Sequence, residues 1–207
     1  MEKASTKQTL APDDYLSIKA SSEGLYKDNG SRFLSLAYPV KSAEEAEEIV
    51  KKLRKEHYDA THHCYAYRIG LKGEPWRAND DGEPSGTAGR PILGELLSRN
   101  LSDILVVVVR WFGGVKLGVP GLIKAYRTAT QEALLNAETI TKTATLPIKI
   151  TFPYSQTDKV LRELRKRNIE DSDKKFEEEC SLTAHVPLSK TESLKEILLK
   201  IEDVRID

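Results

Sequence analysis

The sequence predicts an α+β protein with two domains, residues 1–140 and 141–207. Strand-like and amphipathic helical runs alternate through the first part, and the alanine-rich helical pattern ends near ETITKTA (138–144). A β-type run, LPIKITFPY, follows at once, and the order β-α-β-β-α begins there. A chain of 207 residues that is 39% hydrophobic is long enough to bury a substantial core.

The first elements are a hairpin and a helix. The runs DYLSIKASS and SRFLSLAYPV flank the turn-forming KDNG (27–30) and predict two paired strands, the second of which ends at Pro39. Ser42 and Glu45 form a capping box at the start of a helix with one apolar stripe. The pattern is typical of a helix that lies on a sheet.

THHCYAYRIGL (61–71) predicts the third strand, and KGEPWRANDDGEP after it predicts a long irregular crossing of the surface. A helix is expected from about Gly86 to Arg99. The continuous apolar run DILVVVVR (103–110) indicates a central strand that is buried on both faces.

The glycine-rich turn WFGGVKLG then leads into a long helix with Pro120 in its first turn. The residues of this helix that we expect to face inward share a helical spacing: Tyr126, Ala129, Ala133, Leu134 and Ala137.

The second domain is expected to be a ferredoxin-like β-α-β-β-α module with its helices on one face of an antiparallel sheet. Ser155 with Asp158, and Ser189 with Glu192, have the spacing of capping boxes and predict the starts of the two helices.

Composition excludes several classes of protein. Lys and Arg total 32, as do Asp and Glu, so the net charge predicts no general affinity for polyanions or membranes. The first dozen residues contain no apolar core of a signal peptide, and no stretch approaches 18 consecutive apolar residues. Cys64 and Cys180 are too few for a disulfide framework. We therefore expect a cytoplasmic protein with two reduced thiols, no membrane contact and no cofactor.

The stretch DDGEPSGTAGRPILGELL (80–97) has the composition of a functional turn. Its serine stands one position too late for a nucleophile elbow, no lysine completes a Walker A loop, and the G-x-G-x-x-G pattern is missing. What remains is a helix start in which Ser85 or Gly86 caps and the first amides are free to bind an anion. Two other interpretations stay open. Pro84, Gly86 and Gly89 could merely allow a sharp turn and close packing, and Glu83 is the plausible base or metal ligand of a catalytic site.

The anion site is expected to use the loop after the central strand as well. That strand delivers Arg110 to its end, and Lys116 follows the glycine pair. The complete predicted set of anion-binding residues is Ser85, Gly86, Thr87, Gly89, Arg90, Arg110 and Lys116.

A metal site is not expected. Asp80, Asp81 and Glu83 have the ligand type of Mg²⁺, but solvated loop acids are the simpler interpretation. His62 and Cys64 share one side of their strand while the histidine between them points away, and no second cluster of ligands accompanies them.

Two stretches could contact nucleic acid. The loop RWFGGVKLGVPG places basic and aromatic residues on an open turn, although such residues also close cores. KVLRELRKR (159–167) is the densest basic stretch, on a helix whose Val160, Leu161 and Leu164 can face the sheet. The candidate residues are Arg110, Trp111, Phe112, Lys116, Lys159, Arg162, Arg165, Lys166 and Arg167.

Three blocks in order, SRFLSLAYPVKSAEEAEEIVKKLRKEHYDATHHCYAYRIG, DDGEPSGTAGRPIL and VVVVRWFGGVKLGVPGLIKAY, closely resemble the YigZ/IMPACT family. The resemblance covers residues 15–138 and matches the specific family motifs at 81–89 and 110–118. Val119 and Pro120 stand where the family commonly has alanine and glycine, which stiffens the turn. Trp111 replaces the usual tyrosine and so lacks its hydroxyl.

The resemblance implies an N-terminal domain with the fold of elongation factor G domain IV and of a ribosomal small-subunit protein domain. The tail from about residue 143 is similar to another domain of elongation factor G. Together these point to RNA and translation. The eukaryotic relative restrains a translational kinase by occupying its activator, a partner that does not carry over.

Three functions follow as hypotheses. The first is a non-enzymatic RNA- or ribosome-associated regulator of translation. The second is a small enzyme that acts on a nucleotide or phosphorylated metabolite, in which Glu83, Ser85 and Arg110 should meet in one pocket. The third is a protein–protein adaptor of the translation machinery.

Overall fold

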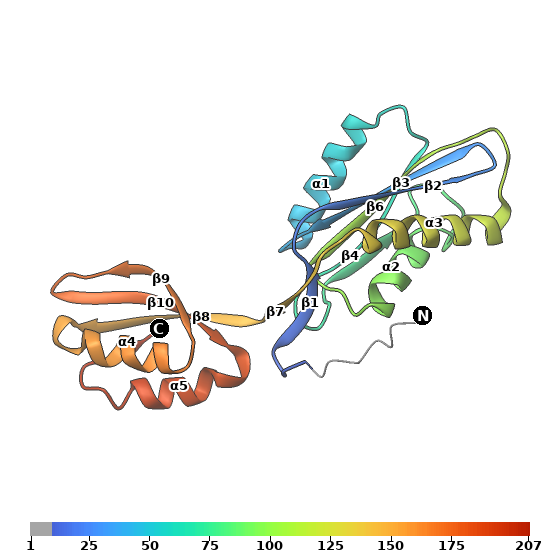
Figure 1. The fold of residues 1–207 in the computed structure, drawn as a ribbon. Coiled ribbons are helices and arrows are strands. Elements are labelled where there is room, and N and C mark those ends of the chain that lie inside the picture. The colour runs from blue at the N-terminus through green and yellow to red at the C-terminus, as the bar shows by residue number, and fades with distance from the viewer. Residues whose placement is uncertain (1–9) are drawn as a thin grey trace. The chain divides into compact units, whose positions relative to one another are not determined.

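The structure, a computed structural model, describes residues 10–207, which form two compact units (Figure 1). The larger unit is Tyr15–Lys142, and the smaller is Thr143–Asp207 with the residues just before Tyr15. Both units combine helices with antiparallel strands, so the two-domain α+β class is confirmed. Independent folding of residues 1–140 and 141–207 stays a prediction. No helix within residues 10–207 is long and apolar enough to cross a membrane.

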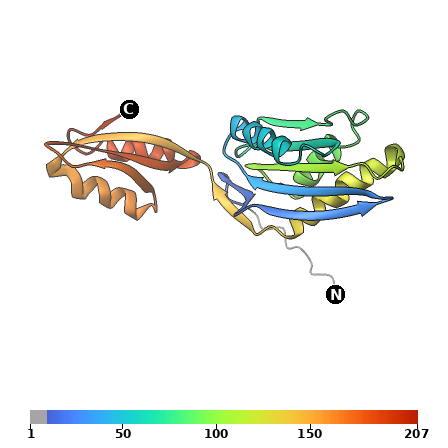
Figure 2. The same cartoon turned by 90° about the horizontal axis from the view of Figure 1, so that it is seen from above.

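The larger unit is built on a five-stranded antiparallel sheet in the order β2-β3-β6-β4-β5, whose strands lie side by side in Figure 2. Its strands are β2 (Ser22–Asp28), β3 (Ser31–Pro39), β4 (His62–Arg68), β5 (Trp76–Asn79) and β6 (Ile104–Trp111). As expected of a continuous apolar run, β6 is the middle strand, and its residues from Ile104 to Arg110 are buried.

The helices cover both faces of this sheet (Figure 1). Alternate residues of β6 face opposite ways: Val106 and Val108 enter the core under α2 and α3, whereas Val107 and Val109 enter the core under α1. The three helices are α1 (Ala43–Glu56), α2 (Gly89–Ser98) and α3 (Gly118–Leu135). The predicted inward face of α3 is confirmed for Tyr126, Ala129, Ala133 and Leu134. The prediction is wrong for Ala137, because α3 ends at Leu135 and Ala137 lies partly buried beyond it.

Three expectations about this unit need correction. The hairpin joins β2 and β3 around Asn29 and Gly30, while the earlier run forms a separate strand, β1 (Asp14–Ile18). The crossing expected to be irregular contains β5, which pairs with β4. The polar joint at 138–144 is itself a strand, β7 (Thr139–Thr143), paired with β1.

The smaller unit has a four-stranded sheet in the order β11-β8-β10-β9, with α4 and α5 on one face (Figure 1). This is the expected ferredoxin-like module, completed by a short last strand. Its elements are β8 (Thr145–Pro153), α4 (Thr157–Lys166), β9 (Glu170–Lys175), β10 (Glu179–Pro187), α5 (Thr191–Leu198) and β11 (Arg205–Ile206).

The capping boxes expected in this unit are wrong. Short 3₁₀ turns at Tyr154–Gln156 and Leu188–Lys190 precede α4 and α5, and no side chain in the described part of the chain caps either helix. Ser189 instead donates from its backbone nitrogen and hydroxyl to the Asp13 carboxylate, at 2.9 and 2.6 Å. The box at α1 is confirmed, because Ser42 Oγ accepts from the Glu45 amide.

Candidate functional site

The start of α2 is occupied by a carboxylate of the chain itself. Asp80 Oδ1 accepts hydrogen bonds from the backbone nitrogens of Ala88 and Gly89, at 3.0 and 2.8 Å, and Oδ2 accepts from that of Gly86 at 2.8 Å. A negative side chain at this position satisfies the otherwise unpaired amides and complements the helix dipole. Asp80 therefore takes the place that an external anion would have.

This arrangement corrects the predicted anion site. Ser85 is exposed and Ala88 is the N-cap residue, so neither Ser85 nor Gly86 caps α2. Thr87 is buried and donates its hydroxyl to the Pro84 carbonyl at 2.7 Å. Gly89 lies so close to β5 that an added Cβ would be 2.5 Å from the Asn79 nitrogen. The glycine therefore serves close packing of helix and sheet, as the structural interpretation held.

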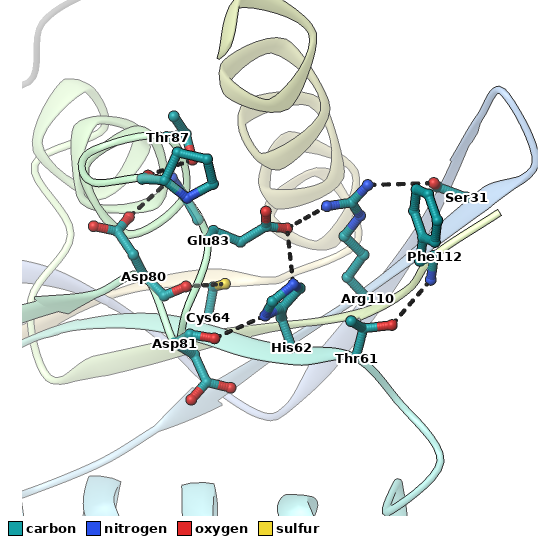
Figure 3. Close-up of polar contacts among 12 residues, drawn as sticks. Ser31, Thr61, His62, Cys64, Asp80, Asp81, Glu83, Thr87, Arg110 and Phe112 are labelled. Carbon is teal, nitrogen blue, oxygen red and sulfur yellow. Dashed lines mark hydrogen bonds and ion pairs between the residues drawn. The ribbon is translucent and has the colours of Figure 1, made fainter. Parts of the chain in front are cut away.

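Asp81 ties the same turn to β4. Its Oδ2 accepts from the His63 backbone nitrogen at 2.6 Å, and its Oδ1 lies 2.5 Å from Arg54. Its carbonyl oxygen lies 2.8 Å from His62 Nδ1 (Figure 3). These acids are thus structural rather than free loop carboxylates. No group of three His, Cys, Asp or Glu side chains within residues 10–207 is arranged to hold a metal ion.

Glu83 and Arg110 form a buried ion pair beneath α3 (Figure 3). Arg110 Nη1 donates to Glu83 Oε1 at 2.5 Å, and the Tyr126 hydroxyl donates to the same oxygen at 2.7 Å. His62 Nε2 lies 3.9 Å from it. The Glu83 side chain is only 4% exposed, so these donors hold the carboxylate in one position.

Cys64 and Tyr126 extend this cluster into the core. The Cys64 sulfur lies 3.0 Å from the Asp80 carbonyl oxygen and 3.3 Å from the Tyr126 hydroxyl. Burial raises the pKa of the Cys64 thiol, and it also raises the pKa of Tyr126, to which the neighbouring Cys64 and Glu83 add. Both groups therefore stay protonated near neutral pH and act as structural members of the site.

The residues that follow Arg110 point to different faces of the sheet. The Arg110 guanidinium lies 5.6 Å from the centre of the Phe112 ring, which is 47% exposed. Trp111 is partly buried and packs against the core under α1, where the Arg32 guanidinium sits 3.8 Å from its ring centre and Asp59 accepts from its indole N–H. Phe112 is thus the aromatic surface of this loop, and Trp111 is not beside it.

Glycine fixes the path of the loop. Gly113 donates to Ser31 Oγ at 3.2 Å, and an added Cβ at Gly113 would lie 1.9 Å from the Gly30 carbonyl carbon. Gly114 has a φ of 88°, which favours glycine. Phe112 is held from the other side, because its backbone nitrogen donates to Thr61 Oγ1 at 3.2 Å (Figure 3).

A hollow of about 380 Å³ opens where this loop meets α3. Leu117 is the N-cap residue of α3, and no side chain of residues 10–207 caps the helix. No acidic residue lies in its first turn. The exposed Lys116 stands beside this helix start. The residues that line the hollow are Glu83, Pro84, Arg110, Phe112, Lys116, Leu117, Gly118, Val119 and Leu122.

Part of the predicted set therefore comes together and part does not. Arg110, Phe112 and Lys116 share the hollow, whereas Ser85 and Arg90 do not line it. The sequence pattern predicted neither the capping role of Asp80 nor the place of Tyr126 and His62 beside Glu83. Asp80 precedes α2 by nine residues, beyond the reach of any local capping rule, and Tyr126 has the pattern of an ordinary core residue.

The basic helix α4 belongs to the smaller unit. Val160 and Leu164 are buried and Leu161 is partly buried, so the predicted apolar face is confirmed. Lys166 and Arg167 pair with Glu163 at 2.9 and 2.5 Å. The exposed cations of α4 that make no ion pair with any of residues 10–207 are Lys159, Arg162 and Arg165.

Comparison with known proteins identifies the family. Residues 29–134 match the Impact N-terminal domain. The chain is 34% identical over 193 residues to IMPACT family member YvyE of Bacillus subtilis, covering 93% of this chain and 89% of that protein. It is 38% identical over 128 residues to IMPACT family member YigZ of Escherichia coli, covering 61% and 63%.

A crystal structure of a hypothetical protein is also similar over nearly the whole length of both chains. The TM-score is 0.71 at 28% sequence identity, with 94% of this chain and 96% of the other covered. The two-unit fold thus recurs in a solved structure. The predicted family resemblance is confirmed by the domain match and by the curated relatives. The chain belongs to the IMPACT family.

Proposed function

We propose that this protein is a non-enzymatic, RNA- or ribosome-associated regulator of translation, and that its larger unit contacts RNA at the hollow before α3. The observation that carries the proposal is the uncapped start of α3 beside Lys116 and the half-exposed ring of Phe112. Free amides and a lysine suit a phosphate, and an exposed ring suits an unstacked base. The likeness to domains of translation proteins that the sequence resemblance implies stays an expectation, and it points to the same function.

The charge of the site argues for a backbone contact that is local rather than extended. Arg110 is neutralised by Glu83, and the start of α2 is neutralised by Asp80. Lys116 is the exposed cation that lines the hollow. The exposed cations of α4 supply a second, independent contact in the smaller unit.

Binding of fluorescent single-stranded RNA to the full chain over a series of salt concentrations tests the proposal. Neutralising about four phosphates gives a log–log salt slope of roughly −3. Replacing Lys159, Arg162 and Arg165 with glutamine should reduce the magnitude of the slope. An unchanged slope would move the contact to the larger unit alone, and RNA binding that is absent at low salt would overturn the function.

The second candidate function is an enzyme that acts on a nucleotide or phosphorylated metabolite. In its favour, Glu83 and Arg110 line the same hollow. Against it, Ser85 is exposed and does not line the hollow, and Glu83 Oε1 already accepts from two side chains. Steady turnover of a phosphorylated compound that is abolished by Glu83→Gln would favour the enzyme.

A further inference from the structure

The hollow before α3 contains a carboxylate oxygen that the proposed phosphate contact does not use. Glu83 Oε1 accepts hydrogen bonds from Arg110 and Tyr126, but none of residues 10–207 donates a hydrogen bond to Oε2. Figure 3 shows this second oxygen turned away from Arg110 and His62. The Glu83 side chain is 96% buried and lines the hollow, so Oε2 is the carboxylate oxygen left to accept from a group that enters there.

The other walls suit a flat, largely apolar group. Phe112, Leu117, Val119 and Leu122 supply apolar surface, and the volume of about 380 Å³ lies within the range of small-ligand sites. Val119 is 52% exposed at the helix start. A nucleobase can stack on such a ring and place its polar edge against the acceptor.

The position of one carboxylate selects among the bases. The Watson–Crick edge of guanine carries a ring N–H directly beside an exocyclic amino group, so two donors can converge on one acceptor. Adenine and cytosine present one amino group beside a ring nitrogen whose lone pair a carboxylate repels. Uracil presents one N–H between two carbonyl oxygens, which are also repelled.

We propose that the hollow binds one guanine base of single-stranded RNA, with Glu83 accepting from its Watson–Crick edge and Lys116 and the α3 start contacting its phosphate. Arg110 and Tyr126 act as positioning residues that fix the carboxylate. The inference rests on the proposed RNA binding and adds a base preference to it.

The test compares guanosine and inosine 5′-monophosphates, which differ only in the exocyclic amino group. Titration of the isotope-labelled full chain, followed by NMR, should give a dissociation constant about fivefold to tenfold lower for the guanosine nucleotide. Adenosine and uridine 5′-monophosphates should bind more weakly than either. The amide signals of Gly118 and Gly121 should shift with the guanosine nucleotide.

Two variants separate the hollow from its surroundings. Phe112→Ala should weaken guanosine binding by about fivefold or more, because the base loses the ring on which it stacks. Val115→Ala is the matched control, since Val115 is exposed in the same loop but does not line the hollow. Glu83→Gln should abolish the preference for guanosine over inosine. If that variant fails to fold, the difference in affinity of the wild-type protein for the two nucleotides still tests the base preference.

Equal binding of the guanosine and inosine nucleotides would overturn the base preference. RNA binding that no mononucleotide displaces would also overturn it, while leaving the proposed function in place. Guanosine binding without RNA binding would support the pocket and overturn the RNA function. Absence of both would overturn both.

Discussion

The glycine-rich turns before α2 and α3 look alike in sequence but differ in what they leave exposed. Neither N-cap residue, Ala88 or Leu117, offers a side-chain hydrogen bond. The amides of α2 are satisfied by Asp80, whereas α3 begins uncapped beside Lys116. Whether a helix start is free to bind an anion therefore depends on the nearest acidic side chain in space rather than on the glycine pattern of the turn.

Removal of Asp80 is the strongest test of the difference between the starts of α2 and α3. Asp80→Ala leaves three backbone N–H groups without an acceptor, each of which costs roughly 1 to 3 kcal/mol. We expect a loss of about 4 kcal/mol in the free energy of unfolding, measured by urea denaturation. Asp80→Asn should lose less, because its amide keeps one carbonyl acceptor.

Glu48→Ala is the matched control for Asp80. Glu48 is an exposed acid on α1, and its replacement should change the free energy of unfolding by less than about 0.5 kcal/mol. If the Asp80→Ala protein were as stable as this control, the cap at α2 would contribute little. The contrast between the two helix starts would then fail.

A second prediction concerns the glycines. Gly113→Ala would place a Cβ 1.9 Å from a backbone carbon of Gly30, and should cost about 2 kcal/mol by thermal unfolding. It should also weaken RNA binding, because the loop that carries Phe112 and Lys116 must shift.

Gly94 provides the opposite case. It lies exposed within α2, and an added Cβ would contact nothing within 4 Å. Gly94→Ala should therefore stabilise the protein by up to about 1 kcal/mol, since alanine favours the helix. Equal effects of the two substitutions would show that the close approach of Gly113 to Gly30 does not restrain the loop.

Features that depend on local sequence could be predicted, whereas those that depend on tertiary contacts could not. The apolar pattern predicted that β6 is the central strand and which face of α3 points inward. The spacing of Ser42 and Glu45 predicted the capping box of α1. Each of these signals is local in the sequence. Asp80 and Asp13 were not identified as helix-start and turn partners, because their contacts join segments that only the tertiary fold brings together. Arg110 was correctly placed at the end of β6, but its pairing with Glu83 depends on how two loops meet.

A third prediction compares the two helix starts by their contribution to RNA binding. Lys116→Ala should lower the affinity for single-stranded RNA about fivefold at low salt and reduce the magnitude of the salt slope by about 0.7. Arg90→Ala removes an equally exposed cation from the start of α2 and should change neither quantity. Fluorescence anisotropy measures both. A larger effect of Arg90→Ala would place the anion at α2 after all, despite Asp80.

The smallest expected effect lies behind the same turn, at His63. Burial lowers its pKa below the ordinary value of 6.5, and the positive charge of Arg54 and of His57 adds to this, while Asp81 opposes it. Because the unfolded chain binds this proton more readily than the folded one, His63 leaves stability intact above about pH 6.5 and reduces it as the pH falls from there toward the folded pKa. The Asp81 contact to the His63 backbone limits the loss, since a protonated ring gains a nearby carboxylate, 3.9 Å away. Thermal unfolding between pH 7.5 and pH 5 should therefore show a shallow decrease in the midpoint, and His63→Gln should make that decrease shallower. Identical slopes in the two proteins would assign the pH dependence to other groups and remove His63 from the account of this turn.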